Sequence, residues 1–138
     1  AFAAIDYTLC SKASIVEIIN ECKSAVNWLA HSYLKYNYDP KKIYISGSSA
    51  GAHLAAMCCT KNHSQDKFNI SDIAGLVLVS GIYDLEPLVT TSINKAIGMD
   101  RKTAVGASPL FGNLSRFPKT IISWGEYGRK ANSFFKRV

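Results

Sequence analysis

The 138-residue sequence predicts an α/β domain in which helices flank a mostly parallel sheet. Apolar runs of strand length alternate with segments of helical periodicity, and such alternation is typical of strand–helix–strand units with parallel strands. Hydrophobic residues make up 48% of the chain and charged residues 19%, a balance typical of a globular protein. A chain of this length is expected to form a single domain with a sizeable core.

The first half of the chain predicts a strand, a long helix and a turn. Residues 2–7 form a nearly continuous apolar run, as expected of a strand buried on both faces. Ser14 and Glu17 have the spacing of a capping box, which predicts a helix start. Apolar residues then recur at helical spacing at positions 15, 18, 19, 22, 25, 26, 29 and 33. The sequence Asn-Tyr-Asp-Pro at 37–40 ends the helix, because the residue before proline disfavours helical backbone.

The second half predicts three more strands. Residues 42–46 form a strand that leads directly into a helix over 51–60, and a polar loop over 61–72 follows. The runs at 73–81 and 118–124 are the third and fourth predicted strands, with helical material expected within 86–108 and 131–138. Because ligands bind at the carboxyl ends of parallel strands, the segments 47–51, 81–85 and 125–128 are expected to line the functional site.

The turn at Ser49 is the most informative motif. The pattern Gly47-Ser-Ser49-Ala50-Gly51 lies between a predicted strand and a predicted helix, which is the setting of a nucleophile elbow. In that turn Ser49 is the nucleophile, the flanking glycines leave room for a strained backbone, and the Ala50 amide can stabilise an oxyanion. The alternative is a small-residue turn without chemistry. Neither common phosphate-binding glycine pattern is present in the sequence.

Three stretches of the sequence resemble the α/β-hydrolase superfamily. They read AIDYTLCSKASIVEIINECKSAVNWL, YDPKKIYISGSSAGAHLAAM and LVLVSGIYDLEPL, and the likeness extends from about residue 3 to 126. Within the superfamily the chain is most similar to the kynurenine formamidases (arylformamidases) and related esterases. The resemblance implies a serine hydrolase that cleaves N-formylkynurenine, in tryptophan breakdown, or a small ester. It also implies Ser49 as nucleophile, Ala50 as oxyanion donor, and no metal or organic cofactor.

The histidine base expected of such an enzyme is missing. In this superfamily the nucleophile is followed along the chain by an acid and then by a histidine. The sequence contains only His31, His53 and His63, and none of them follows the last predicted strand. His53 lies one helical turn after Ser49, where similar enzymes also carry a histidine that is not the base.

The sequence offers two candidates for the acid. The resemblance aligns Gly128 with the family's acid position, and Glu126 lies two residues before it as a candidate substitute. Asp84, after the third predicted strand, is a second candidate, although in this family it is expected to shape the loop. A third alternative is that neither residue serves as the acid.

The missing parts suggest a central fragment of a hydrolase domain. The chain begins inside an apolar run without methionine, and it lacks the family's N-terminal strands and C-terminal histidine segment. These 138 residues alone are therefore expected to be nearly inactive and, because strand edges are left open, poorly soluble. The competing hypothesis is a catalytically inactive hydrolase-fold remnant that binds a ligand or partner.

Charge and cysteine content exclude several other classes. The net charge is +6, but the 16 Lys and Arg residues are spread along the chain, which predicts a solvated surface and no nucleic-acid binding. The spacing of the four cysteines fits neither a zinc site nor a disulfide framework, which favours reduced thiols and a cytoplasmic protein. We expect a small-molecule substrate and no membrane partner, and the longer protein could form a homodimer.

Overall fold

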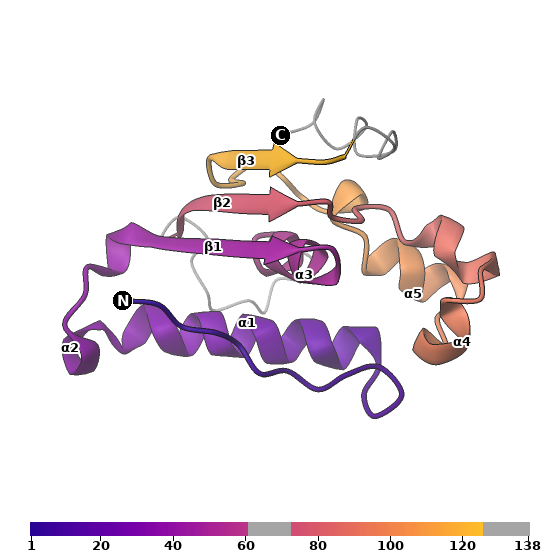
Figure 1. Cartoon of the computed structure of the whole chain (residues 1–138), viewed down its shortest axis with the longest axis horizontal. Helices are drawn as coiled ribbons and strands as arrows, with labels where there is room; N and C mark the ends of the chain where they lie inside the picture. Colours follow the sequence, from indigo (N-terminus) through magenta and orange to yellow (C-terminus); the bar gives the residue numbers. More distant parts are fainter. Residues whose placement is uncertain (61–72, 126–138) are drawn as a thin grey trace.

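The computed structural model describes residues 1–60 and 73–125. Its elements, in chain order, are α1 (Ile15–His31), α2 (Tyr33–Tyr36), η1 (Pro40–Lys42), β1 (Ile43–Ser48), α3 (Ala50–Cys58), β2 (Ile73–Val79), η3 (Glu86–Thr90), α4 (Asn94–Ile97), α5 (Arg101–Gly106), η4 (Pro109–Phe111) and β3 (Thr120–Ser123) (Figure 1). Strands therefore alternate with helical segments, as the sequence predicts.

The three described strands form one parallel sheet in the order β1-β2-β3. Ser48 of β1 pairs with Val79 of β2, and Val79 pairs in turn with Ser123 of β3. All three strands therefore end at the same level, and their carboxyl ends point toward α4 and α5 (Figure 1). The predicted α/β class and parallel sheet are confirmed.

The strand predicted for residues 2–7 is wrong. This segment has no strand structure, and Phe2 at its start is 92% exposed. A strand requires a hydrogen-bonded neighbour, and none of the described strands pairs with this segment. The segment runs alongside α1 instead (Figure 1), where the Thr8 amide donates a 2.8 Å hydrogen bond to the Glu21 carboxylate.

Helix α1 begins at the predicted capping box. The Ser14 hydroxyl accepts a 3.3 Å hydrogen bond from the Glu17 amide, and the Glu17 carboxylate accepts one of 2.8 Å from the Ser14 amide. The Ser14 amide and the Ser14 hydroxyl both donate hydrogen bonds to the Glu17 carboxylate, and these lower the pKa of Glu17. The buried face of the helix matches the predicted spacing at Ile15, Ile18, Ile19, Cys22 and Val26. Tyr33 does not belong to this face, because α1 ends at His31 and Tyr33 is exposed in α2.

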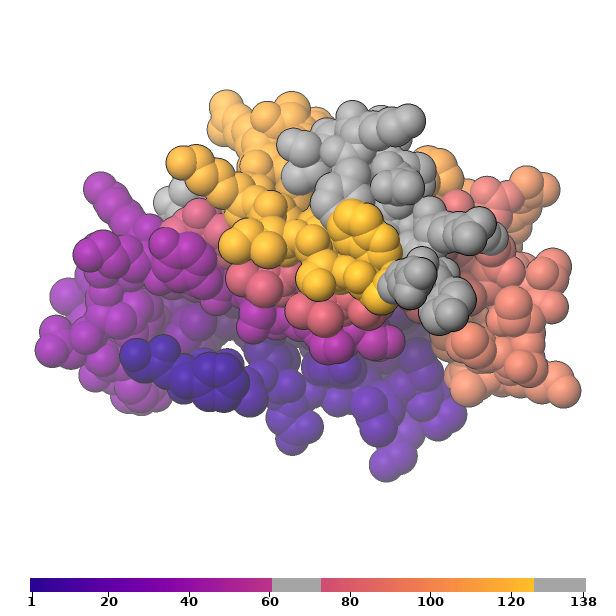
Figure 2. All heavy atoms as spheres, turned by 45° about the horizontal axis from the view of Figure 1, so that its top comes forward, coloured from indigo at the N-terminus to yellow at the C-terminus, as the bar shows by residue number. Residues whose placement is uncertain are grey.

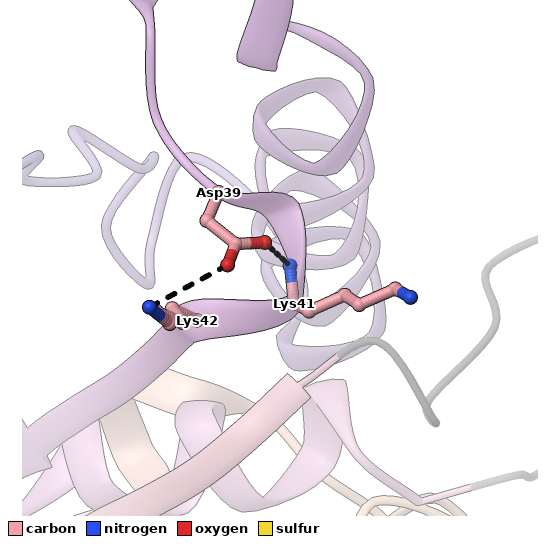
Figure 3. Close-up of polar contacts among 3 residues, drawn as sticks. All are labelled: Asp39, Lys41 and Lys42. Atoms are coloured by element: carbon pink, nitrogen blue, oxygen red, sulfur yellow. Dashed lines mark hydrogen bonds and ion pairs between the residues drawn. The ribbon is translucent and has the colours of Figure 1, made fainter.

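The predicted turn at 37–40 directs the chain into β1. Asn37 ends α2 in a left-handed conformation with φ of 53°. The Asp39 carboxylate then accepts a 2.9 Å hydrogen bond from the Lys41 amide, and its other oxygen lies 3.7 Å from the Lys42 ammonium (Figure 3). These local contacts form the short helix η1 and fix the start of β1, the strand that ends at Ser48.

Helix α3 forms the centre of the core. Every residue from Ala52 to Cys58 is buried, and the helix packs against both α1 and the sheet. Leu76 and Leu78 of β2 are among the core residues, whereas the alternate Val77 and Val79 are exposed. Tyr44 of β1 and Ile121 of β3 are exposed as well, by 69% and 68%. Figure 2 shows atoms of all three strands reaching the surface side by side.

No helix within 1–60 or 73–125 combines the length and hydrophobicity needed to cross a bilayer. All four cysteines lie in these ranges and are free thiols. Cys22, Cys58 and Cys59 are buried in the core, whereas Cys10 is partly accessible.

Candidate active site

Ser49 occupies a sharp turn between a strand and a helix. Strand β1 ends at Ser48 and helix α3 begins at Ala50, so that Ser49 is the single connecting residue. Its φ of 53° and ψ of −117° lie in a region that L-residues rarely adopt, and its side chain is exposed. This is the strand–turn–helix arrangement that the sequence predicts.

Backbone hydrogen bonds on both sides hold this strained residue in place. The Ser49 amide donates a 2.8 Å hydrogen bond to the Val79 carbonyl of β2. The Ser49 carbonyl accepts hydrogen bonds from the amides of Ala52 at 3.1 Å and His53 at 3.2 Å, which closes the first turn of α3. Because first-turn amides have no partner within a helix, the Ala50 N–H is available to a bound anion beside Ser49.

The two glycines of the motif have different roles. A Cβ atom on Gly47 would lie 2.2 Å from the Gly51 carbonyl oxygen and 2.7 Å from the Ala52 nitrogen. The strand and the helix approach so closely at Gly47 that no other residue fits. A Cβ on Gly51 would have no heavy atom within 4 Å. Within the described residues, the steric requirement for glycine therefore holds at Gly47, whereas a side chain at Gly51 would enter open space.

His53 is a structural histidine. The ring is 4% exposed, and its Nε2 lies 2.7 Å from the Ala107 carbonyl oxygen. A carbonyl only accepts hydrogen bonds, so Nε2 carries the proton and donates it. Burial lowers the pKa of His53, and this hydrogen bond opposes the shift only in part. His53 is thus a neutral tether between α3 and the residue that follows α5.

The other histidines do not supply a base within the described residues. His31 is the last residue of α1, and its Nδ1 lies 2.8 Å from the Asn27 carbonyl oxygen. That end of α1 lies beside α2, away from the tip of β1 where Ser49 follows (Figure 1). His63 lies outside the described residues.

Asp84 shapes the loop after β2. One carboxylate oxygen accepts a 3.0 Å hydrogen bond from the Glu86 amide, at the start of η3. The Glu86 carboxylate pairs with Arg101 at the start of α5. Asp84 therefore orders this loop as the sequence predicts, and no described contact connects it with a histidine. Glu126, the other candidate acid, lies outside the described residues.

Sequence reasoning missed Ser80, the residue that follows β2. Its φ of 50° is also left-handed, and its amide donates a 2.7 Å hydrogen bond to the Ser123 carbonyl of β3. The next residue, Gly81, packs under Tyr83, because a Cβ on Gly81 would lie 2.4 Å from the Tyr83 hydroxyl oxygen. Burial raises the pKa of Tyr83 to about 12, although a hydrogen bond with the Gly81 backbone opposes the shift. The only trace of the left-handed Ser80 backbone in the sequence is the Ser80-Gly81 pair, which is too common to predict it.

The arrangement suits nucleophilic chemistry, and the described residues contain no candidate metal centre. An exposed serine hydroxyl lies beside an available helix N-terminal amide, which suits attack on a carbonyl and binding of the resulting oxyanion. Within residues 1–60 and 73–125, no group of three or more His, Cys, Asp or Glu side chains could hold a metal ion.

Comparisons with known proteins place the chain in a family. The BD-FAE family model matches residues 1–116. The kynurenine formamidase of Danio rerio is 33% identical over 107 residues, which cover 77% of this chain and 34% of that protein. The isoprenylcysteine α-carbonyl methylesterase of Arabidopsis thaliana is 25% identical over 101 residues, covering 69% of this chain and 24% of that protein.

A solved structure supports the fold. Carboxyl esterase 2 from the fungus Tuber melanosporum superimposes with a TM-score of 0.80 at 24% identity, covering 96% of this chain and 50% of the esterase chain. The chain thus spans a quarter to a third of the two curated relatives, and half of this solved esterase.

Proposed function

The chain belongs to the BD-FAE family, within the α/β-hydrolases, and from this premise we propose that it carries the nucleophile of a serine hydrolase. Ser49 attacks the carbonyl carbon of a formamide or a carboxylic ester. The observation that supports this proposal most strongly is the left-handed backbone of an exposed serine placed between β1 and α3.

The proposed reaction begins with the Ser49 hydroxyl. Its oxygen forms a bond to the carbonyl carbon while its proton passes to a base, and the carbonyl oxygen becomes an oxyanion that the Ala50 N–H stabilises. The protonated base then gives its proton to the departing amine or alcohol as the bond to the carbonyl carbon breaks, which leaves a formyl or other acyl ester on Ser49 that water hydrolyses. The base is neither His31 nor His53, because one lies at the far end of α1 and the other is buried and hydrogen-bonded to Ala107.

N-formylkynurenine is the first candidate substrate, and a small carboxylic ester is the second. One relative is named a kynurenine formamidase and another a methylesterase, and these names denote hydrolysis of a formamide and of a methyl ester. The chemistry at Ser49 is the same for both candidates, so direct comparison of turnover with N-formylkynurenine and with p-nitrophenyl acetate decides between them.

A fluorophosphonate probe tests the nucleophile. The protein is expressed from its natural coding sequence, incubated with the probe, and the modified residue is identified by peptide mass spectrometry. We expect modification of Ser49, and its loss in Ser49→Ala. The matched control is Ser48→Ala, because Ser48 is also exposed and directly precedes the nucleophile but belongs to β1. A folded protein that the probe leaves unmodified would show that Ser49 is not a working nucleophile.

That negative result would favour a second function, a catalytically inactive hydrolase fold that binds a ligand or a partner. The observation behind this alternative is that His53 and Asp84 are both engaged in holding loops together. Binding of N-formylkynurenine or p-nitrophenyl acetate without turnover, measured by calorimetry, would be its signature.

A further inference from the structure

A second strained serine lies beside Ser49. Val79, the last residue of β2, pairs with Ser48, and its carbonyl accepts a hydrogen bond from the Ser49 amide. Ser49 and Ser80 therefore each follow one residue of a paired position at the same edge of the sheet. Neighbouring strands are about 5 Å apart, which places Ser80 one strand spacing from the nucleophile. Both side chains are exposed.

The backbone at Ser80 would favour glycine over serine. A φ of 50° is unfavourable for serine and unrestricted for glycine. Gly81 directly follows, yet it is not among the left-handed residues, and it is required for the different reason that Tyr83 packs against it. A glycine at position 80 would therefore make the turn at a lower conformational cost.

The described residues give the Ser80 side chain no hydrogen-bond partner. Within the described residues its hydroxyl makes no hydrogen bond, whereas the buried Ser108 hydroxyl links Ala104 and Leu85. The Ser80 turn is held by the backbone alone, through the amide bond to Ser123. The exposed Ser80 hydroxyl, on a residue with strained backbone beside Ser49, is therefore available to hydrogen-bond a bound molecule.

We propose that Ser80 is a substrate-binding residue whose hydroxyl donates a hydrogen bond to the molecule that Ser49 attacks. This inference rests on the proposed function of Ser49. The spacing of one strand suits an N-formyl arylamine that carries a hydrogen-bond acceptor on the ring position next to the formamide. N-formylkynurenine has a ketone there, and formanilide has the same formamide on an unsubstituted ring.

Equilibrium binding tests Ser80 independently of turnover. In a Ser49→Ala background, calorimetry measures the dissociation constants of N-formylkynurenine and formanilide with and without Ser80→Gly. We expect Ser80→Gly to weaken binding of N-formylkynurenine about fivefold, the equivalent of one neutral hydrogen bond of about 1 kcal/mol, and to leave formanilide unchanged. Because glycine relieves the left-handed strain, the variant is expected to fold at least as stably as the parent.

Ser11→Gly is the matched control. Ser11 is an exposed serine with φ of 82° in the loop before α1, so the same substitution relieves the same kind of strain at a different place. We expect Ser11→Gly to leave both dissociation constants unchanged. Equal effects of Ser80→Gly on the two ligands, no effect on either, or no binding of N-formylkynurenine to the parent would overturn the inference.

The fluorophosphonate experiment separates this inference from the proposed function. Modified Ser49 with no ligand-selective effect of Ser80→Gly would leave the hydrolase standing and remove Ser80 from its binding site. Selective binding through Ser80 with unmodified Ser49 would do the reverse, and would describe a binding protein.

Discussion

Replacement of Gly47 by alanine is expected to disrupt the elbow more severely than any other single methyl group in the motif. The added Cβ would lie 2.2 Å from the carbonyl oxygen and 2.3 Å from the carbonyl carbon of Gly51. A normal contact exceeds 3 Å, so the first turn of α3 would have to move by about 1 Å relative to β1. Overpacking typically lowers the free energy of unfolding by about 1–3 kcal/mol. The clashing atoms here belong to the backbone and cannot rotate away, so we expect the upper value of about 3 kcal/mol.

Gly51→Ala provides the matched comparison four residues away. Its Cβ meets nothing within 4 Å, and Gly51 is the second residue of α3, so alanine should stabilise the helix by about 0.5–1 kcal/mol. The two variants should thus differ by about 4 kcal/mol in their free energy of unfolding, measured by urea denaturation. In thermal unfolding Gly47→Ala should lower Tm by about 10 °C.

The free energy of unfolding of Gly47→Ala can also contradict this prediction. If the free energy of unfolding of Gly47→Ala lies within about 1 kcal/mol of the parent value, β1 and α3 do not approach as closely as described. The close strand–helix turn at Ser49 would then be wrong as well. Probe labelling adds an independent readout, because Gly51→Ala should keep Ser49 reactive while Gly47→Ala should abolish labelling even below its Tm.

Three further predictions follow from the core and the sheet. The pKa of His53 is lowered in the folded state, so as pH falls the unfolded state takes up a proton at a higher pH than the folded state does. The free energy of unfolding should therefore fall as pH drops below about 6.5. His53→Gln should remove this part of the pH dependence, measured by urea denaturation at several pH values. At about pH 8 a thiol reagent such as DTNB should modify Cys10 readily and spare Cys58, whose pKa burial raises; modification of Cys58 in folded protein would contradict the described core. The paired substitutions Tyr44→Thr and Ile121→Thr should reduce self-association in sedimentation velocity and change the free energy of unfolding by less than about 1 kcal/mol, because both side chains are exposed on the sheet.

The sequence predicts those features that local patterns determine. The capping box at Ser14 and Glu17 specifies the start of α1 through two hydrogen bonds within four residues. The turn before β1 depends similarly on Asp39 and its near neighbours. The elbow at Ser49 is recognisable because a glycine at position 47 is sterically required there. In each case the interacting groups are close in sequence, so the contact that stabilises the element can be read from the sequence pattern itself.

Features that depend on distant partners are predicted less well. The apolar run at 2–7 has strand composition, but composition does not supply the neighbouring strand that a ladder needs. Gly51 matches the motif as well as Gly47 does, and only the approach of β1 to α3 distinguishes their roles. Ser80 has no sequence pattern of its own: its left-handed backbone goes with a hydrogen bond to Ser123 on a different strand, far along the chain.

Formation of the elbow and provision of a base are separate physical problems. The strain at Ser49 is offset by the hydrogen bond to Val79, by the two amides that close the first turn of α3, and by the buried helix behind them. All of these groups lie within the described core, so the reactive geometry does not depend on a general base being present. His53 illustrates the division, because burial and the bond to Ala107 make it a good tether for the same reasons that make it unsuited to accept a proton from Ser49. A stable elbow is therefore compatible with both the hydrolase and the inactive binding protein, and only the reactivity of Ser49 itself separates them.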